Sequence, residues 1–268
     1  MTATPHFFWI AANRYASRLP PVDQALEDPN GLLAAHGDLA PDTLLAAYRA
    51  GVFPWYSVGQ PILWWSPDPR AVFFPARLHV SRSLARTLRR GTFEVGLDGD
   101  FAGVIDGCAS PRGDDAGTWI TPEMRAAYLR LHRLGHAHSV ECRHAGRLVG
   151  GVYGVAIGRV FFGESMFSRM TDASKVALAT LCGWLTDWGY ELFDCQVGNS
   201  HLSSLGAVAL PRPAFVDMLA TLCALEPAKS AWQPPSEASS TLNHPRGRRS
   251  GSSSRRRTSA ATCPSATP

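Results

Sequence analysis

The sequence lacks paired cysteines, long apolar runs and a secretory leader, and each absence narrows the class of protein. Six cysteines are scattered over 268 residues with no C-x-x-C pair, which favours free thiols in a reducing compartment over disulfides or a zinc site. No apolar run is long enough to cross a membrane. The first residues do not show the basic-then-apolar order of a signal peptide. We therefore expect a cytoplasmic protein with no metal, no cofactor and no membrane contact.

Charge is also sparse, at 18% of residues, and its net value of +4 is unevenly placed. Residues 233–268 contain six arginines and one glutamate, which leaves 20 basic and 21 acidic side chains in residues 1–232. That final segment consists largely of Pro, Ser, Arg and Thr, a composition that cannot bury enough surface to fold. We predict a disordered basic tail over 233–268. It follows a small aromatic-rich lobe (1–70) and a larger domain (71–232).

The chain is organised around residues 148–206. Two β-branched and aromatic runs, Leu148–Ile157 and Val160–Phe162, meet at Gly158-Arg159 and predict a tight hairpin. A helix follows from an expected cap at Asp172 to Gly189, and the run 191–197 then predicts a strand fed by that helix. Alternation along this strand places Asp194 and Gln196 on one face and Cys195 on the other.

Cap signals predict three further helices and locate a basic face. Pro41 opens one that ends at Gly51, Thr121 caps one that ends near Leu134, and Pro213 opens the last. Ser81 or Ser83 caps a fourth, over which arginines fall near one face: Arg82, Arg86, Arg89 and Arg90. This face is either a solvated surface or a ridge that contacts nucleic-acid phosphates. Four histidines between 132 and 144 have no partner set that suits a metal, so we interpret them as structural.

Several sequence blocks together resemble one enzyme family. They are PNGLLAAHGDLAPDTLLAAYRAGVFPWYS (29–57), ILWWSPDPRAVF (62–73), GTWITPEM (117–124), YLRLHRLGHAHSVE (128–141), GESMFSRMTDASK (163–175) and FDCQVGNSHLSSLGA (193–207). In collinear order they resemble the leucyl/phenylalanyl-tRNA–protein transferases. The resemblance implies an α/β (α+β) fold in which a small N-terminal lobe precedes an acetyltransferase-like mixed-sheet domain. It also implies a monomer in the cytoplasm that transfers Leu, Phe or Met from aminoacyl-tRNA to N-terminal Arg or Lys, marking proteins for N-degron degradation.

Aminoacyl transfer needs positioning more than a strong base. The nucleophile is an α-amine whose pKa, about 7.7–8.0, leaves a useful neutral fraction at neutral pH. Asp194 can orient that amine, and Gln196 can accept from it or donate to the carbonyl. Both positions match the family's functional pair. Glu164 is the third expected catalytic residue and either pairs with the substrate or caps Arg169 or a turn.

The remaining expected site residues bind substrate. Val152, Phe161 and Met166 match hydrophobic pocket positions of the family, although each also suits a plain core. Trp55 matches an aromatic near the tRNA's terminal adenosine, with lobe packing as the alternative. Asn199 is either a substrate contact or ordinary turn chemistry.

Two other functions stay open at this point. One is an acyl-CoA-dependent N-acetyltransferase on a similar fold, which normally carries a glycine-rich pyrophosphate loop where this chain has SRMTDAS. The other is a non-catalytic module that binds an RNA end or a peptide. Covalent catalysis through Cys195 is not expected, because no activating base lies near it in the sequence.

Overall fold

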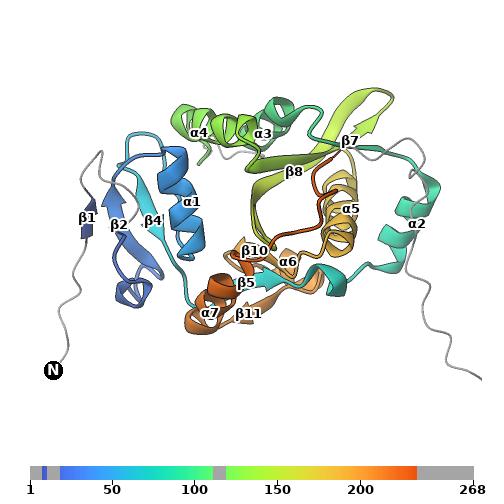
Figure 1. The fold of residues 1–268 in the computed structure, drawn as a ribbon. Helices are drawn as coiled ribbons and strands as arrows, with labels where there is room; N and C mark the ends of the chain where they lie inside the picture. The colour runs from blue at the N-terminus through green and yellow to red at the C-terminus, as the bar shows by residue number, and fades with distance from the viewer. Residues whose placement is uncertain (1–7, 11–18, 111–118, 234–268) are drawn as a thin grey trace, which may run out of the picture. The chain divides into compact units, whose positions relative to one another are not determined.

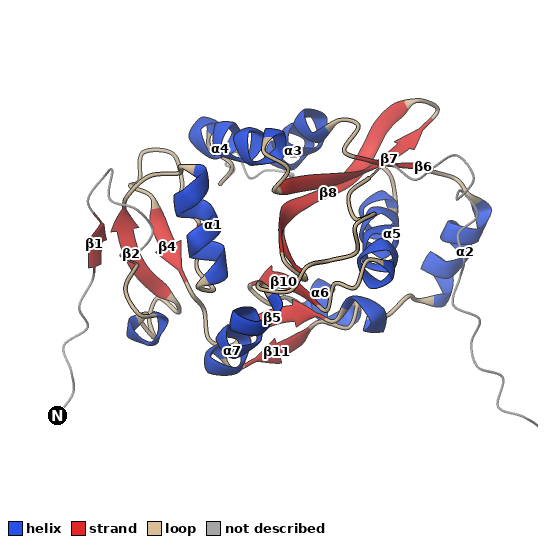
Figure 2. Cartoon of the chain, in the orientation of Figure 1, coloured by secondary structure: helices blue, strands red, loops and turns tan. Residues whose placement is uncertain are grey.

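The computed structural model describes residues 8–10, 19–110 and 119–233, all within one compact unit. They form the predicted mixed α/β (α+β) fold on two sheets (Figures 1 and 2). The smaller sheet has the strand order β1-β2-β4-β3 and the larger has β11-β5-β10-β9-β8-β7-β6.

The strands are β1 (Phe8–Ile10), β2 (Leu32–His36), β3 (Phe53–Pro54), β4 (Leu63–Trp65), β5 (Arg70–Phe73), β6 (Glu94–Leu97), β7 (Ala137–His144), β8 (Arg147–Ile157), β9 (Val160–Ser168), β10 (Leu192–Gln196) and β11 (Val208–Leu210). The helices are α1 (Pro41–Arg49), α2 (Arg82–Arg90), α3 (Phe101–Ala109), α4 (Pro122–Arg133), α5 (Ala173–Asp187), α6 (Ser200–Ser204) and α7 (Arg212–Leu222), with short 3-10 turns η2 (Val22–Gln24) and η3 (Pro75–Arg77).

The four predicted helix starts are confirmed. Pro41 lies in the first turn of α1 and Pro213 in that of α7, where the N–H that proline lacks would have no partner within the helix. The Ser81 hydroxyl accepts from the amide of Leu84 at the start of α2, and the Thr121 hydroxyl accepts from the amide of Met124 at the start of α4. Each of these two hydroxyls satisfies a backbone N–H that has no partner within the helix. Among the described residues, no helix is long and apolar enough to span a membrane.

The larger sheet confirms the predicted hairpin and the strand after it. β8 and β9 pair antiparallel, and β10 then pairs parallel with β9 after the α5 connection. The turn requires glycine at 158, since a Cβ there would lie 2.5 Å from the carbonyl oxygen of Leu222. β5 pairs antiparallel with the other edge of β10. As a result Arg70, the first residue of β5, lies beside the end of β10.

Three local expectations around this sheet need correction. β9 continues to Ser168, so Glu164 lies within a strand and not after it, and it is the residue of β9 left without a partner between the pairs of Tyr153 and Gly154. Asp172 is the N-cap residue of α5, as expected, but its side chain accepts no capping hydrogen bond and binds Lys175 instead. The alternation of β10 also fails at its end, where the register shifts between Asp194 and Gln196.

Two predictions about domain organisation stay predictions. The change of sheet falls between Trp65 of β4 and Arg70 of β5, close to the predicted boundary at residue 70. One apolar core nevertheless contains residues of both sheets, including Trp64 and Phe162. Of the predicted tail over 233–268, everything from residue 234 onward lies outside the described residues.

Candidate active site

A buried ion pair joins β5 to the end of β10. The Arg70 guanidinium donates from Nε and Nη2 to the two carboxylate oxygens of Asp194, at 2.8 and 2.7 Å. Both side chains are fully buried. Arg70 also donates to the carbonyl of Gly51 and lies between the rings of Phe53 and Phe215, 4.7 and 4.8 Å from their centroids. Water does not reach this pair. If either charged side chain were removed, the other would therefore remain buried with no partner to compensate its charge.

The same carboxylate shapes the bulge that carries Gln196. Asp194 Oδ1 accepts from the backbone N–H of Gln196 at 2.8 Å, and Gln196 has a φ of 63°. A left-handed conformation is unfavourable for a non-glycine residue and persists where its surroundings hold it. The side-chain amide is fixed as well, since Nε2 donates to Glu164 Oε1 at 2.9 Å. The oxygen of that amide is thereby directed away from Glu164.

Glu164 lies at the centre of a ring of short hydrogen bonds. Its oxygens are each 2.6 Å from a tyrosine hydroxyl, Oε1 from Tyr48 and Oε2 from Tyr128, and the two hydroxyls are 2.6 Å apart. Three such contacts need three protons, and the tyrosines supply only two. The protonated form of Glu164 would supply the third. Consistently, burial raises the pKa of Glu164 to about 7, although the hydroxyls of Tyr128 and Tyr48 oppose the shift.

These groups open onto a small cavity of about 170 Å³. It is lined by Phe53, Pro54, Trp55, Trp119, Glu164, Cys195, Gln196 and Val197. The exposed side chains of Trp55 and Val197, at 45% and 48%, form part of its wall. At about 30 Å³ per water molecule, the space equals that of about six water molecules. The geometry therefore presents one carboxyl and one oriented carboxamide to a small cavity beside an exposed indole.

Comparison with known proteins identifies the family that shares this site. The sequence matches the family model described as leucyl/phenylalanyl-tRNA protein transferase over residues 72–220, and the model for its N-terminal domain over residues 37–68. The chain belongs to this family. Proteins with the curated name leucyl/phenylalanyl-tRNA–protein transferase are similar over most of their length. That of Pseudomonas putida (strain W619) is 60% identical over 212 residues, 79% of this chain and 93% of the relative. That of Nitrosomonas europaea is 56% identical over 213 residues, with 80% and 90% covered.

Solved structures add only distant likenesses. L-PGS from Bacillus licheniformis matches with a TM-score of 0.35 and 10% identity, covering 62% of this chain and 53% of that one. A GCN5-related N-acetyltransferase from Kribbella flavida also gives a TM-score of 0.35, with 12% identity and coverage of 64% and 61%. At these scores neither likeness carries an argument. The acetyltransferase-like part of the expected fold therefore stays a prediction, whereas the mixed sheet is directly described.

The expected residues of the transferase family separate into two groups in space. Glu164, Gln196 and Trp55 meet at the small cavity, with Asp194 buried behind Gln196. Asp194 is thus fully buried and does not line the cavity, although the strand pattern placed it on the same face as Gln196. Its depth follows from the pairing with Arg70, which no local pattern announces.

The expected apolar pocket residues lie elsewhere. Val152, Phe161 and Met166 belong to the core cluster that packs against α5, and none lines either of the two cavities described. Trp232 stacks on Phe161 with ring centroids 5.5 Å apart. Asn199 caps α6, because its side chain accepts from the amide of Leu202 at 2.9 Å. This helix-capping role explains the presence of Asn199 without a substrate contact.

The four arginines of α2 are all exposed and form one basic face, as the helical spacing predicted. None of Arg82, Arg86, Arg89 and Arg90 takes part in an ion pair with another described residue. Unpaired guanidinium groups are available to phosphates, which favours the second of the two interpretations of this face.

Cysteine and histidine side chains have structural surroundings. Burial raises the pKa of the Cys195 thiol well above its usual range, and the charge of Asp194 adds to the shift. The side chain of His132 contacts the carbonyl of Ala137, and His138 contacts the carboxylate of Asp98. Within the described ranges, no group of three or more His, Cys, Asp or Glu side chains is arranged to hold a metal ion.

Sequence reasoning missed three residues of the site. Arg70 lies in the block ILWWSPDPRAVF, while Tyr48 and Tyr128 lie within two of the predicted helices. Each contacts its partner over a long separation, for example 124 residues from Arg70 to Asp194 and 116 from Tyr48 to Glu164. The only local signal was position: an arginine at a strand start and a tyrosine on a buried helix face.

Proposed function

We propose that this chain transfers leucine, phenylalanine or methionine from aminoacyl-tRNA to the α-amine of proteins that begin with Arg or Lys, marking them for N-degron degradation. The observation that carries the proposal is the contact between Gln196 and Glu164 at the small cavity, in a chain that belongs to the leucyl/phenylalanyl-tRNA–protein transferase family. The acceptor is recognised by its cationic side chain and the donor by its tRNA. A cytoplasmic monomer fits this activity.

The chemistry proceeds by positioning. The free α-amine attacks the ester carbonyl of the aminoacyl-tRNA, a C–N bond forms, the ester C–O bond breaks, and the proton lost by the amine passes to the departing ribose oxygen of the terminal adenosine. Because Glu164 fixes the amide nitrogen of Gln196, the amide oxygen is free to accept a hydrogen bond from the attacking amine. Asp194 acts through Gln196, since its own oxygens are occupied by Arg70 and by the Gln196 amide. Fixed dipoles of this kind cost no reorganisation during the reaction.

Glu164 has a second role toward the acceptor. Binding of a cationic side chain near this carboxyl group stabilises the ionised form of Glu164. The proton that Glu164 shares with Tyr48 and Tyr128 is then released. Trp55 offers an exposed indole face on which a base of the tRNA terminus can stack. The basic face of α2 supplies the electrostatic attraction for the tRNA backbone. Val152, Phe161 and Met166 are retained as the apolar pocket for the donor side chain, which requires Trp232 to move from Phe161.

The acetyltransferase alternative meets an unsuitable helix start. A pyrophosphate binds where backbone N–H groups at a helix N-terminus face the ligand. Before α5 the carboxylate of Asp172 occupies this region and accepts hydrogen bonds from Lys175 and Thr87. The stretch before the helix, SRMTDAS, also lacks the glycines of a pyrophosphate loop.

One assay tests the proposal. Labelled leucine on tRNA is offered with a peptide that begins with Arg, and the same peptide beginning with Ala serves as the control. We expect transfer to the first peptide only, abolished by ribonuclease. Transfer from acetyl-CoA without transfer from leucyl-tRNA would establish the acetyltransferase instead. Binding of either substrate without turnover would indicate a non-catalytic module.

A further inference from the structure

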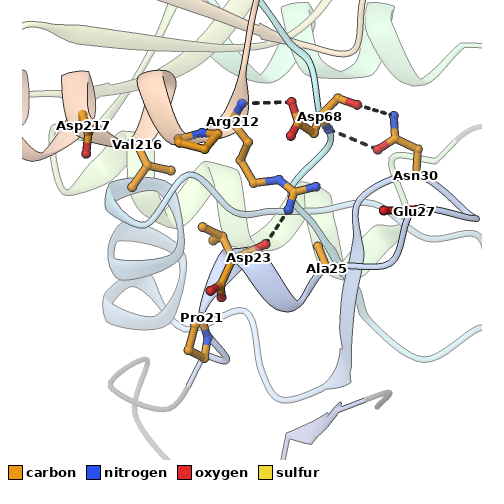
Figure 3. Close-up of a pocket in the computed structure, with 11 residues that line it drawn as sticks. Pro21, Asp23, Ala25, Glu27, Asn30, Asp68, Arg212, Val216 and Asp217 are labelled. Atoms are coloured by element: carbon orange, nitrogen blue, oxygen red, sulfur yellow. Dashed lines mark hydrogen bonds between the residues drawn. The ribbon is translucent and has the colours of Figure 1, made fainter. Parts of the chain in front are cut away.

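The larger of the two cavities described is not the one that holds the proposed reaction centre. It measures about 890 Å³ and lies between the segment that contains η2, the Asp68 turn and α7 (Figure 3). Its walls combine apolar surfaces of Val22, Ala25, Pro213 and Val216 with polar groups at the rim and floor. A cavity of this size accommodates a long side chain together with part of a polypeptide backbone.

The floor carries a buried guanidinium with unused donors. Arg212 is only 9% exposed, and its Nη1 donates to the carbonyl of Val22 at 2.7 Å. Its Nε has no hydrogen-bond partner in the described part of the chain. No carboxylate lies within ion-pair distance of Arg212 among the described residues. Leaving a buried donor unsatisfied is unfavourable, so this side chain points to an acceptor that enters from outside the chain.

The rim has the opposite charge. Asp23, Glu27 and Asp217 are exposed, and none of the three has a hydrogen bond or ion pair to a described residue. Asp68 is held differently, because its Oδ1 accepts from the backbone N–H of Arg212 and its main chain bonds to Asn30. With Arg212 counted, the lining remains acidic. A ligand for this cavity is therefore cationic at the rim and offers a hydrogen-bond acceptor at the floor.

A basic side chain within a polypeptide has these properties. Its aliphatic stem packs on apolar walls while its charged end stays among carboxylates near water. The adjacent peptide carbonyl provides the acceptor for Arg212. We propose that the cavity is a docking cleft for a lysine or arginine in the polypeptide of the acceptor protein, away from the N-terminal residue that reacts. The identity of that polypeptide rests on the proposed function, but the binding itself does not.

Nucleic acid is excluded as the occupant by charge. A phosphate at the rim would face Asp23, Glu27 and Asp217 without a basic side chain of the rim to offset them. The unpaired arginines of α2 offer phosphates a far better surface. The cleft and α2 therefore serve ligands of opposite sign.

Binding of a blocked peptide tests the cleft without any transfer. The peptide is acetylated at its N-terminus, carries a fluorophore and contains two central lysines; its matched partner has norleucine in their place. The full chain is titrated at low salt and anisotropy is recorded. The cleft variant combines Asp23→Asn, Glu27→Gln and Asp217→Asn, and we expect it to weaken binding about tenfold, the scale of three exposed ion pairs. The norleucine peptide is expected to lose binding to the same extent with the unmodified chain.

A matched variant controls for general charge. It combines Glu94→Gln, Asp187→Asn and Glu226→Gln, three exposed carboxylates that do not line the cavity, and should bind the lysine peptide as the unmodified chain does. Equal weakening in both triple variants, absence of binding, or a requirement for a free N-terminus would each overturn the proposal. If lysine amide bound as tightly as the lysine peptide, the occupant of the cleft would be a small cation and not a polypeptide. If the peptide binds and the cleft variant weakens that binding, but no leucine is transferred, only the proposed function is refuted.

Discussion

The buried pair of Arg70 and Asp194 allows stability and catalysis to be separated by mutation. Asp194→Ala removes one partner and leaves a guanidinium that has no access to water. Breaking a buried pair in this way costs about 3–5 kcal/mol, out of a total stability of about 5–15 kcal/mol for a typical protein. The single variant is therefore expected to be poorly stable, and its activity alone cannot assign a catalytic role to Asp194.

Replacing both partners resolves the ambiguity. Exchanging a buried ion pair for apolar residues of similar volume is often neutral or stabilising, by about 1–4 kcal/mol in favourable cases. We expect Arg70→Met with Asp194→Val to restore most of the stability lost in Asp194→Ala. The valine cannot accept from the amide of Gln196, however, so the bulge that orients the carboxamide loses its support. The rate constant kcat should stay lower by about 10²–10³-fold, the scale for one preorganised polar group.

Urea unfolding measures the first quantity, and transfer at saturating tRNA and peptide measures the second. The exposed pair of Arg125 and Asp106 provides a control, because Asp106→Ala should cost less than about 1 kcal/mol and leave kcat unchanged. Recovery of both stability and kcat in the double variant would refute the reasoning and reduce Asp194 to a counter-ion. If Asp194→Ala left the stability unchanged, the expected cost of breaking the buried pair would be refuted.

Three more predictions follow from the site. The pKa of Glu164 is raised from an ordinary value of 4.5 to about 7, so the folded state holds its proton more tightly and stability should fall as pH rises through that interval, by about 3 kcal/mol in all. Glu164→Gln should flatten this decrease in urea unfolding across the pH range, and an unchanged slope would contradict the assignment. Neutralising the four arginines of α2 should raise KM for tRNA more than it lowers kcat, and an unaffected KM would leave that helix as a solvated surface. Cys195→Ser should retain most of the activity, whereas a trapped aminoacyl-enzyme on that thiol would require covalent catalysis.

The parts of the fold that sequence could predict are those fixed by neighbours along the chain. Ser81 and Thr121 cap helices through amides three residues away, and Gly158 closes a hairpin between adjacent strands. The basic face of α2 follows from helical spacing alone. In each case a few consecutive residues contain both the cause and the consequence, so local chemistry is sufficient.

The site escaped full prediction because its decisive contacts join distant segments. Alternation along β10 placed Asp194 and Gln196 on one face, but the structure has a bulge between them, so Gln196 lines the small cavity beside Glu164 while Asp194 is buried. The bulge depends on Arg70, which reaches Asp194 only because β5 pairs with β10. The hydroxyls of Tyr48 and Tyr128 likewise meet Glu164 only after α1 and α4 pack. Family resemblance named the acidic and amide residues, yet it did not provide the residues that hold them.

The near-neutral charge of residues 1–232 is a sum of separated charges rather than an even mixture. The two proposed substrates have opposite signs, since tRNA is a polyanion and the acceptor presents a cation. Electrostatic interactions between exposed groups fade beyond about 8 Å at physiological ionic strength, so arginines on α2 and carboxylates at the cleft act locally and do not cancel. Added salt should weaken both interactions, but more steeply for tRNA, whose binding releases condensed counterions. An even mixture of the same side chains would have the same net charge and would attract neither substrate, which is why the placement of charge, and not its total, bears on function here.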